Sequence, residues 1–446
     1  MPMKKLQVAA PTPIERLLLP FQKFVHNSAM GGILLIACTI IALVWANSSW
    51  GDSYIALWNT LITVGPEGGA ISKPLILWIN DGLMAIFFFV VGLEIKREVL
   101  VGELSSPRKA ALPVAAALGG LALPGIIYFT INAGTPGVSG WAIPTATDIA
   151  FALGVLALLG SRIPTSLKVF LTALAIVDDI GAVLIIALFY TSKLSLTALA
   201  IGGIFFIGLI VANRLGVRRL LVYAILGTGL WVAFLKSGVH ATIAGILCAM
   251  TIPTRTRIDG KEFTTKVKRF LEEFRVGGEP NSDMVMTDHQ RGAVQAIEDA
   301  CDFVESPAHR LEHGLHPYVA FAIMPVFALA NAGVVLEGDI FAALLSPVAL
   351  GVMAGLVLGK QVGITTITWL AVKFGIAQKP EEISWRQIYG VGWLAGIGFT
   401  MSLFITALAF NDPLIITQAK IGILGASLIA GIVGYLLLRA SGKEQR

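Results

Sequence analysis

Four charged residues lie inside stretches of the chain that are otherwise apolar enough to cross a membrane. Asp148 lies in one stretch, Asp178 and Asp179 are adjacent in the next, and Lys360 lies in a later one. A charged side chain at the depth of a bilayer is costly, so such residues usually face an aqueous cavity or one another. The four residues therefore predict a pathway for ions or protons. The alternative is a set of buried salt bridges that only fix how the helices pack.

The oxygen atoms close to these aspartates suit a hard cation. Thr147 and Asp148 in one stretch and Asp178 and Asp179 in the next supply a hydroxyl and three carboxylates, and hard cations such as Na+ and Li+ prefer oxygen ligands. Successive helical residues point about 100° apart, so one of the adjacent aspartates can face an ion path while the other meets a partner such as Lys360. A low dielectric and like charges favour the protonated carboxylate. A proton and a metal ion would then compete for one site.

The composition indicates a membrane protein. Of the 446 residues, 56% are hydrophobic and 14% are charged, whereas a soluble domain carries about 25% charged residues. Because a bilayer core requires roughly 20 apolar residues per helix, the apolar runs predict an all-α polytopic protein with about twelve transmembrane helices. The seventh and eighth are short, and the first is expected to be a retained span and not a signal peptide. The predicted spans are 29–47, 74–95, 110–131, 141–160, 167–190, 194–212, 219–235, 237–252, 317–336, 341–371, 387–410 and 414–438.

Basic residues predict the orientation of these spans. Most Lys and Arg residues fall in the termini and loops of one side, and by the positive-inside rule that side is cytoplasmic. We therefore expect a multi-pass protein of the cell (inner) membrane with both termini in the cytoplasm. The net charge of +5 then reflects topology and not nucleic-acid binding, because no basic stripe with interleaved aromatic residues is present. The opposite side carries Lys73, Lys193, Lys236 and Lys420.

One long segment departs from the membrane pattern. Residues 254–314 are polar. A first helix is predicted by apolar residues at helical spacing in KEFTTKVKRFLEEFR, and a second helix could be capped by Thr287 or Asp288. We expect a helical hairpin under the membrane domain and no enzymatic domain. Residues 47–73 predict a short β-hairpin. The predicted organisation is a cytoplasmic segment 1–28, spans one to eight in 29–253, the cytoplasmic loop 254–314, spans nine to twelve in 315–438 and a cytoplasmic tail 439–446.

Two predicted spans, the fourth and the eleventh, contain features that interrupt helices. In span four, Pro144 removes a helix hydrogen bond, and Thr145 and Thr147 can satisfy the freed groups. In span eleven, a run of glycines precedes Thr400 and Ser402. If spans three to five repeat as spans ten to twelve with inverted topology, the two interruptions correspond, a pattern typical of a midplane site in secondary transporters. The alternative is that the glycines only permit close helix packing. They are Gly390, Gly392, Gly396 and Gly398.

Eight strings, spread over most of the chain outside 254–308, resemble the NhaA family of sodium/proton antiporters. The resemblance implies twelve helices in inverted repeats, with interrupted helices four and eleven crossing near the midplane. It implies Asp178 and Asp179 as the ion and proton site, with Thr147 and Asp148 nearby. It also implies that Asp148 and Lys360 compensate the partial charges of the interrupted helix ends, with Asp178 as a further partner for Lys360. The strings are NDGLMAIFFFVVGLEIKRE (80–98), ATDIAFALG (146–154), AIVDDIGAVLIIALFY (175–190), SGVHATIAG (237–245), RLEHGLHP (310–317), FALANAGV (327–334), LGKQVGI (358–364) and GIGFTMSLFI (396–405).

The function implied by this resemblance is secondary transport. The expected activity is electrogenic, pH-regulated exchange of cytoplasmic Na+ or Li+ for external protons by alternating access, with no catalytic residues, no cofactor and no enzymatic reaction. The expected partners are Na+, Li+, H+ and the lipid bilayer, with no nucleic acid. A homodimer is one option for the oligomeric state, which the sequence leaves open together with the ion preference and the stoichiometry.

The resemblance also implies sensing of cytoplasmic pH. Histidine titrates in the physiological range, and a nearby carboxylate can tune it. One alternative is that these are solvated charges at helix ends and that His240 is a packing or capping residue. A separate alternative is a metal site formed by His309, His313 and His316, which have helical spacing. Two departures from the family pattern are His309 where Lys is expected and Gln361 where Pro is expected. The candidate sensors are Glu94, Lys96, Arg97, Glu98, Glu312, His313, His316 and His240.

Other proteins with membrane aspartates fit the sequence less well. An intramembrane aspartyl protease would need a GxGD string, which this sequence lacks, and a membrane prenyltransferase would need a DDxxD-type cluster, whereas Asp178 and Asp179 are followed by Ile180 and Gly181. A passive channel has no need for a charge-balanced midplane site. A sodium-coupled solute symporter of similar architecture remains the alternative function.

Overall fold

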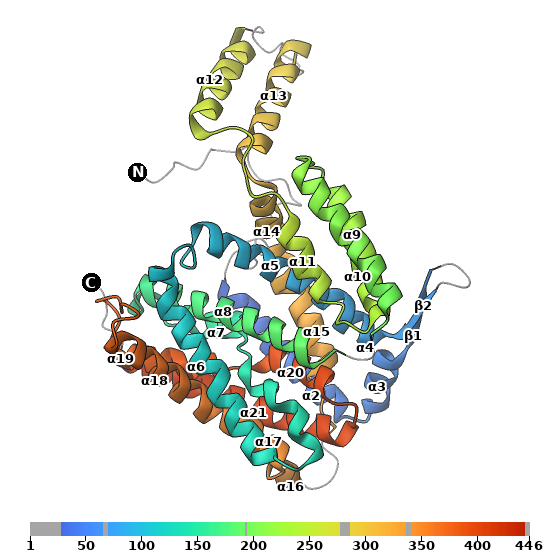
Figure 1. Ribbon diagram of the computed structural model, residues 1–446, viewed down its shortest axis with the longest axis vertical. Helices are drawn as coiled ribbons and strands as arrows, with labels where there is room; N and C mark the ends of the chain where they lie inside the picture. Colours follow the sequence, from blue (N-terminus) through green and yellow to red (C-terminus); the bar gives the residue numbers. More distant parts are fainter. Residues whose placement is uncertain (1–27, 66–69, 192–193, 277–285, 336–339, 442–446) are drawn as a thin grey trace. The chain divides into compact units, whose positions relative to one another are not determined.

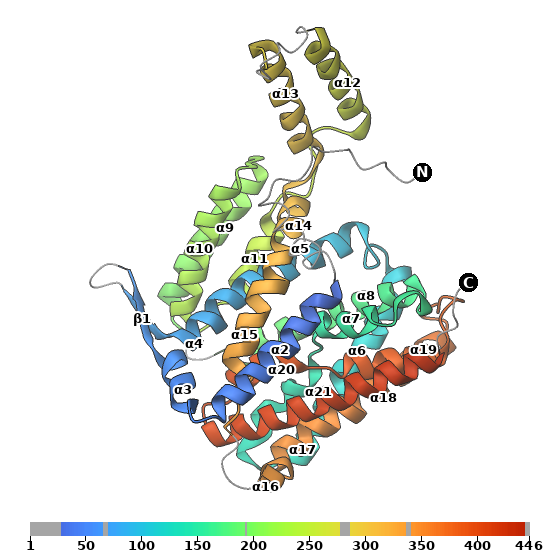
Figure 2. The same ribbon diagram turned by 180° about the vertical axis from the view of Figure 1, so that it is seen from behind.

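The computed structural model describes residues 28–65, 70–191, 194–276, 286–335 and 340–441 (Figures 1 and 2). Helices make up most of this part of the chain. By its internal contacts the chain divides into two compact units. One comprises Met1–Phe87, Glu98–Ser192 and Pro317–Arg446, and the other comprises Phe88–Arg97 and Lys193–His316.

The first unit contains most of the long apolar helices. Short π-helical turns join several of them into continuous runs, so that α4, η1 and α5 form one run and α17, η5 and α18 form another. Its elements are α2 (Ser28–Ala46), α3 (Gly51–Asn59), β1 (Leu61–Val64), β2 (Ile71–Pro74), α4 (Leu75–Trp78), η1 (Ile79–Leu83), the ends of α5 (Met84–Val101), α6 (Pro107–Asn132), η2 (Pro136–Thr145), α7 (Ile149–Ala157), η3 (Gly160–Arg162), α8 (Thr165–Phe189), η4 (Val319–Ile323), α15 (Met324–Asn331), α16 (Ile340–Leu344), α17 (Pro347–Ala354), η5 (Gly355–Gly359), α18 (Lys360–Lys373), α19 (Trp385–Ala395), α20 (Phe399–Ala409) and α21 (Pro413–Ser441).

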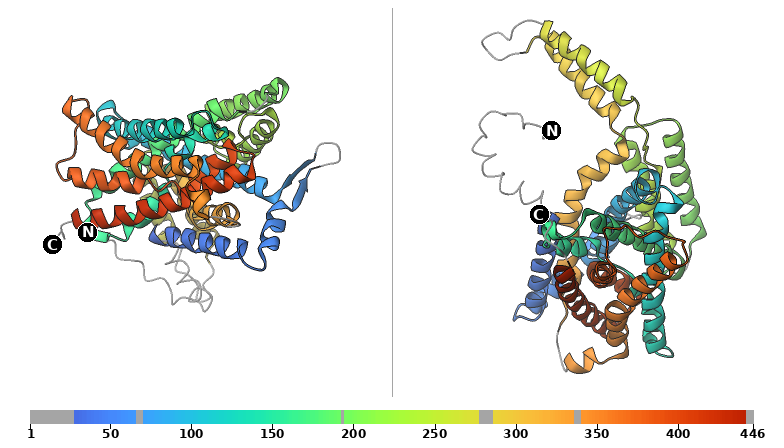
Figure 3. Two further views of the ribbon diagram at one scale, coloured as in Figure 1. Left: turned by 90° about the horizontal axis from the view of Figure 1, so that it is seen from below. Right: turned by 90° about the vertical axis from the view of Figure 1, so that its left-hand side faces the viewer.

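Close backbone contacts hold the helices of this unit together. Helix α6 packs along α17 and α18, and α21 packs along α17 and α19 (Figure 3). Small residues permit this approach, because a β-carbon added to Gly363 would lie 2.1 Å from the carbonyl oxygen of Gly119. The run that contains Lys360 stays helical through Gln361, with a π-helical turn at Gly355–Gly359 directly before the lysine. Gln361 therefore continues the helix where a proline would have removed a backbone donor.

The second unit contains two further apolar helices and a polar helix pair. Helices α9 and α10 pack against each other around a core that includes Leu209, Leu230 and Phe234. Helices α12 and α13 also pack together, and Thr287 forms a capping box with Gln290 at the start of α13, which confirms the predicted cap. The elements are α9 (Leu196–Arg214), α10 (Leu220–Ser237), α11 (Ile243–Thr251), α12 (Gly260–Val276), α13 (Asp288–Val304) and α14 (Pro307–Tyr318).

The described residues contain eight helical runs that are long and apolar enough to cross a membrane, or up to eleven if each of three bent pairs counts as one span. The chain is therefore an all-α polytopic membrane protein. The eighth predicted span, 237–252, contains the nine-residue helix α11, which is about 13 Å long, shorter than a bilayer core of about 30 Å, and is not among these runs. The length of this helix explains why the structure does not reach the predicted twelve.

The predicted β-hairpin is confirmed. Strands β1 and β2 pair antiparallel, with Leu61 opposite Pro74 and Val64 opposite Ile71. Helix α3, which precedes the hairpin, was not expected from the sequence. It bends away from α2 by 111°, and its residues Tyr54 and Trp58 are buried.

The ends of the α12–α13 pair lie close together, which leads to a prediction. The backbone N–H of Arg257 donates to the carbonyl oxygen of Phe303 at 2.8 Å, so a deletion of residues 258–304 joins two ends that are already adjacent. We expect the deleted protein to fold and to retain Na+-dependent proton movement in proteoliposomes, because the charged residues of the apolar stretches lie elsewhere. Loss of folding, measured by size-exclusion chromatography and thermal unfolding in detergent, would show instead that the pair is required for assembly.

Candidate functional site

Two helix interruptions meet in the first unit. Elements η2 and α7 are bent by 41° at the break after Thr145, and α19 and α20 are bent by 44° at the break after Ala395. The two breaks contact each other through the backbone, since the N–H of Asp148 donates to the carbonyl oxygen of Ile397 at 2.7 Å. Both interruptions lie where Pro144 and the glycine run predicted them.

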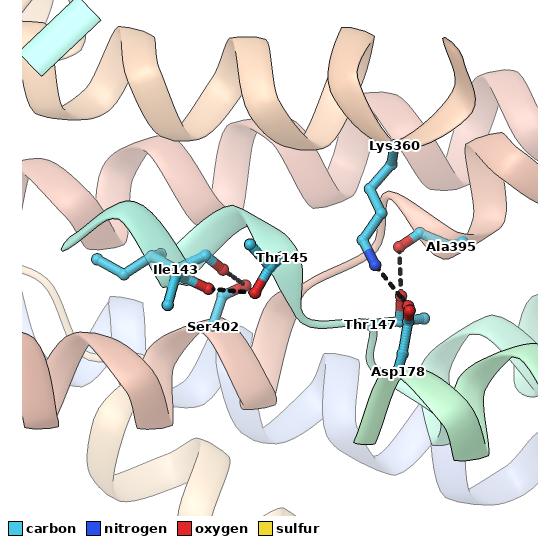
Figure 4. A network of polar contacts seen from close by, with 8 residues as sticks. Ile143, Thr145, Thr147, Asp178, Lys360, Ala395 and Ser402 are labelled. Atoms are coloured by element: carbon cyan, nitrogen blue, oxygen red, sulfur yellow. Dashed lines mark hydrogen bonds and ion pairs between the residues drawn. The ribbon is translucent and has the colours of Figure 1, made fainter. Parts of the chain in front are cut away.

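Polar side chains satisfy the backbone groups that the breaks release. Ser402 donates its hydroxyl to the carbonyl oxygen of Ile143 at 2.7 Å, and Thr145 donates to Ala142 at 2.8 Å (Figure 4). Gly398 permits the close approach, because a β-carbon there would lie 2.2 Å from the hydroxyl oxygen of Ser402 and 3.3 Å from the carbonyl oxygen of Ala146. Irregular backbone at membrane depth is tolerated when its polar groups find such partners inside the protein.

The carboxylate of Asp148 lies at the N-termini of two helices. Its Oδ1 accepts from the backbone N–H of Phe151 at 2.9 Å, at the start of α7. Its Oδ2 accepts from the backbone N–H of Thr400 at 3.1 Å and from the hydroxyl of Thr400, at the start of α20. Asp148 has no solvent-exposed surface. An anion in this position offsets the partial positive charges of both helix ends.

Asp178, Lys360 and Thr147 form a second buried network (Figure 4). The ammonium of Lys360 lies 2.5 Å from Oδ2 of Asp178, and both side chains are fully buried. The hydroxyl of Thr147 lies 2.8 Å from the same carboxylate oxygen and 2.8 Å from the carbonyl oxygen of Ala395. Because a hydroxyl has one proton to donate, Thr147 donates to one of these two oxygens at a time.

The second carboxylate oxygen of Asp178 is available to bind a ligand. Among the residues that the structure describes, Oδ1 of Asp178 is buried and has no hydrogen-bond partner. Asp179, the next residue of α8, is 3% exposed. No group of three or more His, Cys, Asp or Glu side chains in the described ranges is arranged to hold a metal ion. A cation at Asp178 and Asp179 would therefore need neutral oxygens as further ligands.

The candidate pH-sensing residues have several separate partners. Arg97 forms an ion pair with Glu312 at 2.8 Å, and the Glu312 side chain is 7% exposed. The ammonium of Lys96 donates to the carbonyl oxygens of Met250 and Ile252 at the end of α11, a favourable place for a cation. This contact gives Lys96 a structural role.

The remaining candidates make local contacts. Glu98 accepts from the backbone N–H of Glu103 at 2.9 Å. The rings of His309 and His313 pack edge to face with centroids 4.2 Å apart. His240 lies 2.8 Å from the hydroxyl of Thr242, the local contact that a capping histidine would make.

Two groups in these networks, Thr400 and the carbonyl of Ala395, had no partner predicted from the sequence. Thr400 holds Asp148, and its position directly after the glycine run was the available signal. The carbonyl of Ala395 accepts from Thr147. A backbone acceptor of this kind leaves no mark in the sequence, because any residue type carries the same carbonyl group.

Comparison with known proteins decides the family. The family model described as Na+/H+ antiporter 1 matches residues 22–438. The chain belongs to this family. Curated relatives named Na(+)/H(+) antiporter NhaA include those of Oleidesulfovibrio alaskensis, 54% identical over 97% of this chain and 96% of the relative, and Koribacter versatilis, 52% identical over 96% and 92%. A third, from Sulfurimonas denitrificans, is 48% identical over 96% of this chain and 97% of the relative.

Membership of the Na+/H+ antiporter 1 family makes this chain a multi-pass membrane transporter and supports Na+ and H+ as the transported ions. The sodium-coupled symporter that the sequence left open gains no support from these relatives. The predicted classification as an antiporter for sodium is thus confirmed at the level of the family.

The buried Lys360–Asp178 pair leads to a prediction about stability. Lys360→Ala leaves the carboxylate of Asp178 buried without its ammonium partner, and removal of one member of such a pair costs about 3–5 kcal/mol. We expect a clear fall in the thermal unfolding temperature in detergent, and a smaller fall for Lys360→Arg. The double variant Lys360→Ala/Asp178→Asn should be more stable than Lys360→Ala, because it removes both charges.

Lys373→Ala is the matched control on the same helix, since Lys373 contacts only the ring face of Trp369 in the described contacts at 4.6 Å and lies at the exposed end of α18. Its unfolding temperature should stay close to that of the unaltered protein. Equal melting of Lys360→Ala and Lys373→Ala would contradict a stabilising role for the buried pair.

Proposed function

We propose that this protein exchanges cytoplasmic Na+ or Li+ for external protons, and that both ions compete for Asp178 and Asp179. The observation that carries the proposal is the fully buried Asp178, which shares one oxygen with Lys360 and Thr147 and has a second oxygen without a partner in the described residues. A buried carboxylate requires a neutralising partner. The ammonium of Lys360, a proton and a sodium ion can each fulfil this requirement.

Competition among these three cations provides the coupling. A Na+ ion that binds Oδ1 of Asp178 with help from Asp179 weakens the hold of Asp178 on Lys360, because one carboxylate then serves two positive charges. Protonation of the aspartates removes the negative charge that attracts Na+. Bound sodium and bound protons therefore exclude one another. Because two carboxylates and one lysine can carry more than one proton for each Na+ released, the exchange is electrogenic.

The contact between the two helix breaks supports alternating access. A few hydrogen bonds join them, namely Asp148 N–H to Ile397, the Asp148 carboxylate to Thr400, and Thr147 to Ala395. Small movements of either broken helix can exchange these bonds without separating a large packed surface. We infer the twelve-helix architecture of inverted repeats, in which spans four and eleven cross at the midplane. The same proposal includes cytoplasmic termini, the cell inner membrane, and the segments 1–28, 29–253, 254–314, 315–438 and 439–446 as the functional divisions of the chain.

Regulation by pH is proposed for the described helix ends that carry Arg97, Glu312, His313 and His316. Glu312 forms its ion pair with Arg97, and a protonated histidine would be a second cation near the same carboxylate. His316 follows Glu312 by one helical turn and His313 is its neighbour. Protonation of these histidines adds positive charge around the Arg97–Glu312 pair and favours a state with low transport activity. A rise in pH removes that charge.

The test of the ion site uses conservative replacements. Asp178→Asn and Asp179→Asn each keep the side-chain size but remove a titrating carboxylate. We expect both variants to lose Na+- and Li+-driven dissipation of a pH gradient in proteoliposomes by at least about tenfold, because the amide neither takes up and releases a proton nor offers Na+ a charged oxygen. Asp412→Asn, in an exposed turn, is the matched control and should retain exchange. Near-normal exchange in both site variants would overturn the assignment.

The test of regulation measures the pH profile of exchange. The variant His313→Asn/His316→Asn/Glu312→Gln cannot gain charge at these positions. We expect it to remain active at lower pH than the unaltered protein, with a similar maximal rate. The control is His289→Asn in α13, which should leave the profile in place. An unchanged profile in the triple variant would show that the pH dependence arises from competition at Asp178 and Asp179 alone.

A further inference from the structure

One face of α18 carries buried polar groups that have no hydrogen-bond partner among the described residues. Gln361 is 1% exposed and Thr368 has no exposed surface. In the described part of the chain, the amide nitrogen and oxygen of Gln361 and the hydroxyls of Thr365 and Thr368 have no hydrogen-bond partner. These residues follow the helical spacing of one face. We call Gln361, Thr365 and Thr368 the polar face of α18.

Water is the natural partner for such groups. A threonine in an apolar helix commonly bonds to the carbonyl one turn earlier, as Thr406 does with Ser402, but these two threonines do not. Buried polar groups without a protein partner are costly, and internal waters with two to four polar neighbours usually satisfy them. The amide and hydroxyls both donate and accept, which suits water. The polar face has no carboxylate to select a metal cation.

A pocket opens beside this face. It has a volume of about 510 Å³, and its lining includes Thr365, Trp385, Arg386, Tyr389 and Ser441. Thr365 therefore belongs both to the pocket and to the polar face. Gln361 lies one helical turn before Thr365, in the direction of Lys360.

Helix α19 also runs from the pocket to the site that contains Lys360. It begins in the pocket at Trp385 and ends at Ala395, whose carbonyl accepts from Thr147, over about 15 Å. Its Gly392 lies against Gln361, since a β-carbon at Gly392 would be 2.9 Å from the Cα atom of Gln361. The indole N–H of Trp393, on the next residue, is buried and lacks a partner in the described residues. Polar groups without partners thus occur on both helices along this boundary.

We propose that the polar face of α18 and the indole N–H of Trp393 hold a file of internal water molecules between the pocket and Lys360, and that protons travel along it. This inference rests on the proposed function, to which it adds a proton route separate from the Na+ ligands. Arg386 at the pocket disfavours the approach of Na+, and the polar face carries no carboxylate to balance the charge of the ion. Protons move along hydrogen bonds between waters and need no such ligands.

The first arm of the test measures water directly, without transport. In full-length protein with Cys38, Cys248 and Cys301 replaced by serine or alanine, Gln361→Cys and Thr368→Cys are treated in detergent with methyl methanethiosulfonate, a small thiol reagent that carries no charge. A thiol reacts as its thiolate, which requires a hydrated site. The matched control is Ile364→Cys on the same helix, where the native side chain is 0% exposed and faces Gly120. We expect both test cysteines to react at least about tenfold faster than the control; equal rates would overturn the water file.

The second arm measures proton movement. Gln361→Met and Thr365→Val keep the side-chain size and remove the polar atoms. We expect the maximal rate of Na+-driven proton movement to fall severalfold, with the KM for Na+ and the unfolding temperature unchanged. Rapid labelling with an unchanged maximal rate would overturn the proton route. Absence of exchange in the unaltered protein would instead overturn the proposed function, while the labelling arm would still decide whether the file holds water.

Discussion

The buried ion pair between Lys360 and Asp178 is the interaction on which the rest of the first unit depends. Both side chains lie out of contact with solvent, in an interior where an isolated charge is costly. Neither residue can be neutralised by water alone, so the helices that carry them must stay close to each other. The pair therefore constrains α8 and α18, and through Thr147 it also constrains the break in η2–α7 and the end of α19.

The broken helices make this arrangement possible and also pose an electrostatic problem. A helix that stops inside an apolar environment exposes partial charges and unpaired backbone groups. The carboxylate of Asp148 accepts hydrogen bonds from the backbone N–H groups of Phe151 and Thr400 and so stabilises the N-termini of two helices. Asp148 is therefore engaged in holding the breaks, whereas Asp178 keeps one oxygen open. Asp148 and Asp178 both lie in apolar stretches of the sequence, and they differ in their hydrogen bonds because different groups surround them in the fold.

Stability and transport involve the same groups. A buried charge whose hydrogen bonds are all made by a fixed partner would hold that partner too tightly for exchange. A buried charge without any partner would destabilise the site. Asp178 is an intermediate case, because one of its oxygens is paired with Lys360 while the other has no partner in the described residues. Thr147 can also move its hydrogen bond between Asp178 and Ala395. In the proposed cycle of sodium and proton binding, the neutralising cation changes while the helices remain packed.

The sequence by itself determined the membrane class, the interruptions near Pro144 and Gly396, the hairpin of β1 and β2, and the cap at Thr287. These features are local, because apolar length, proline, glycine and capping chemistry act within a few residues. The presence of Asp148, Asp178, Asp179 and Lys360 in apolar stretches could also be read directly, together with the inference that charges at that depth require partners.

Only the tertiary structure decided which partners they have. Lys360 and Asp178 are 182 residues apart in the chain, and helical spacing alone could not choose between Asp178 and Asp179. The same holds for Thr400 at Asp148 and for Arg97 at Glu312. It also holds for the length of α11 and for the polar atoms of Gln361, which find no partner among the described residues once the neighbouring helices are in place. Each of these depends on distances between helices, and such distances follow from packing over the whole unit.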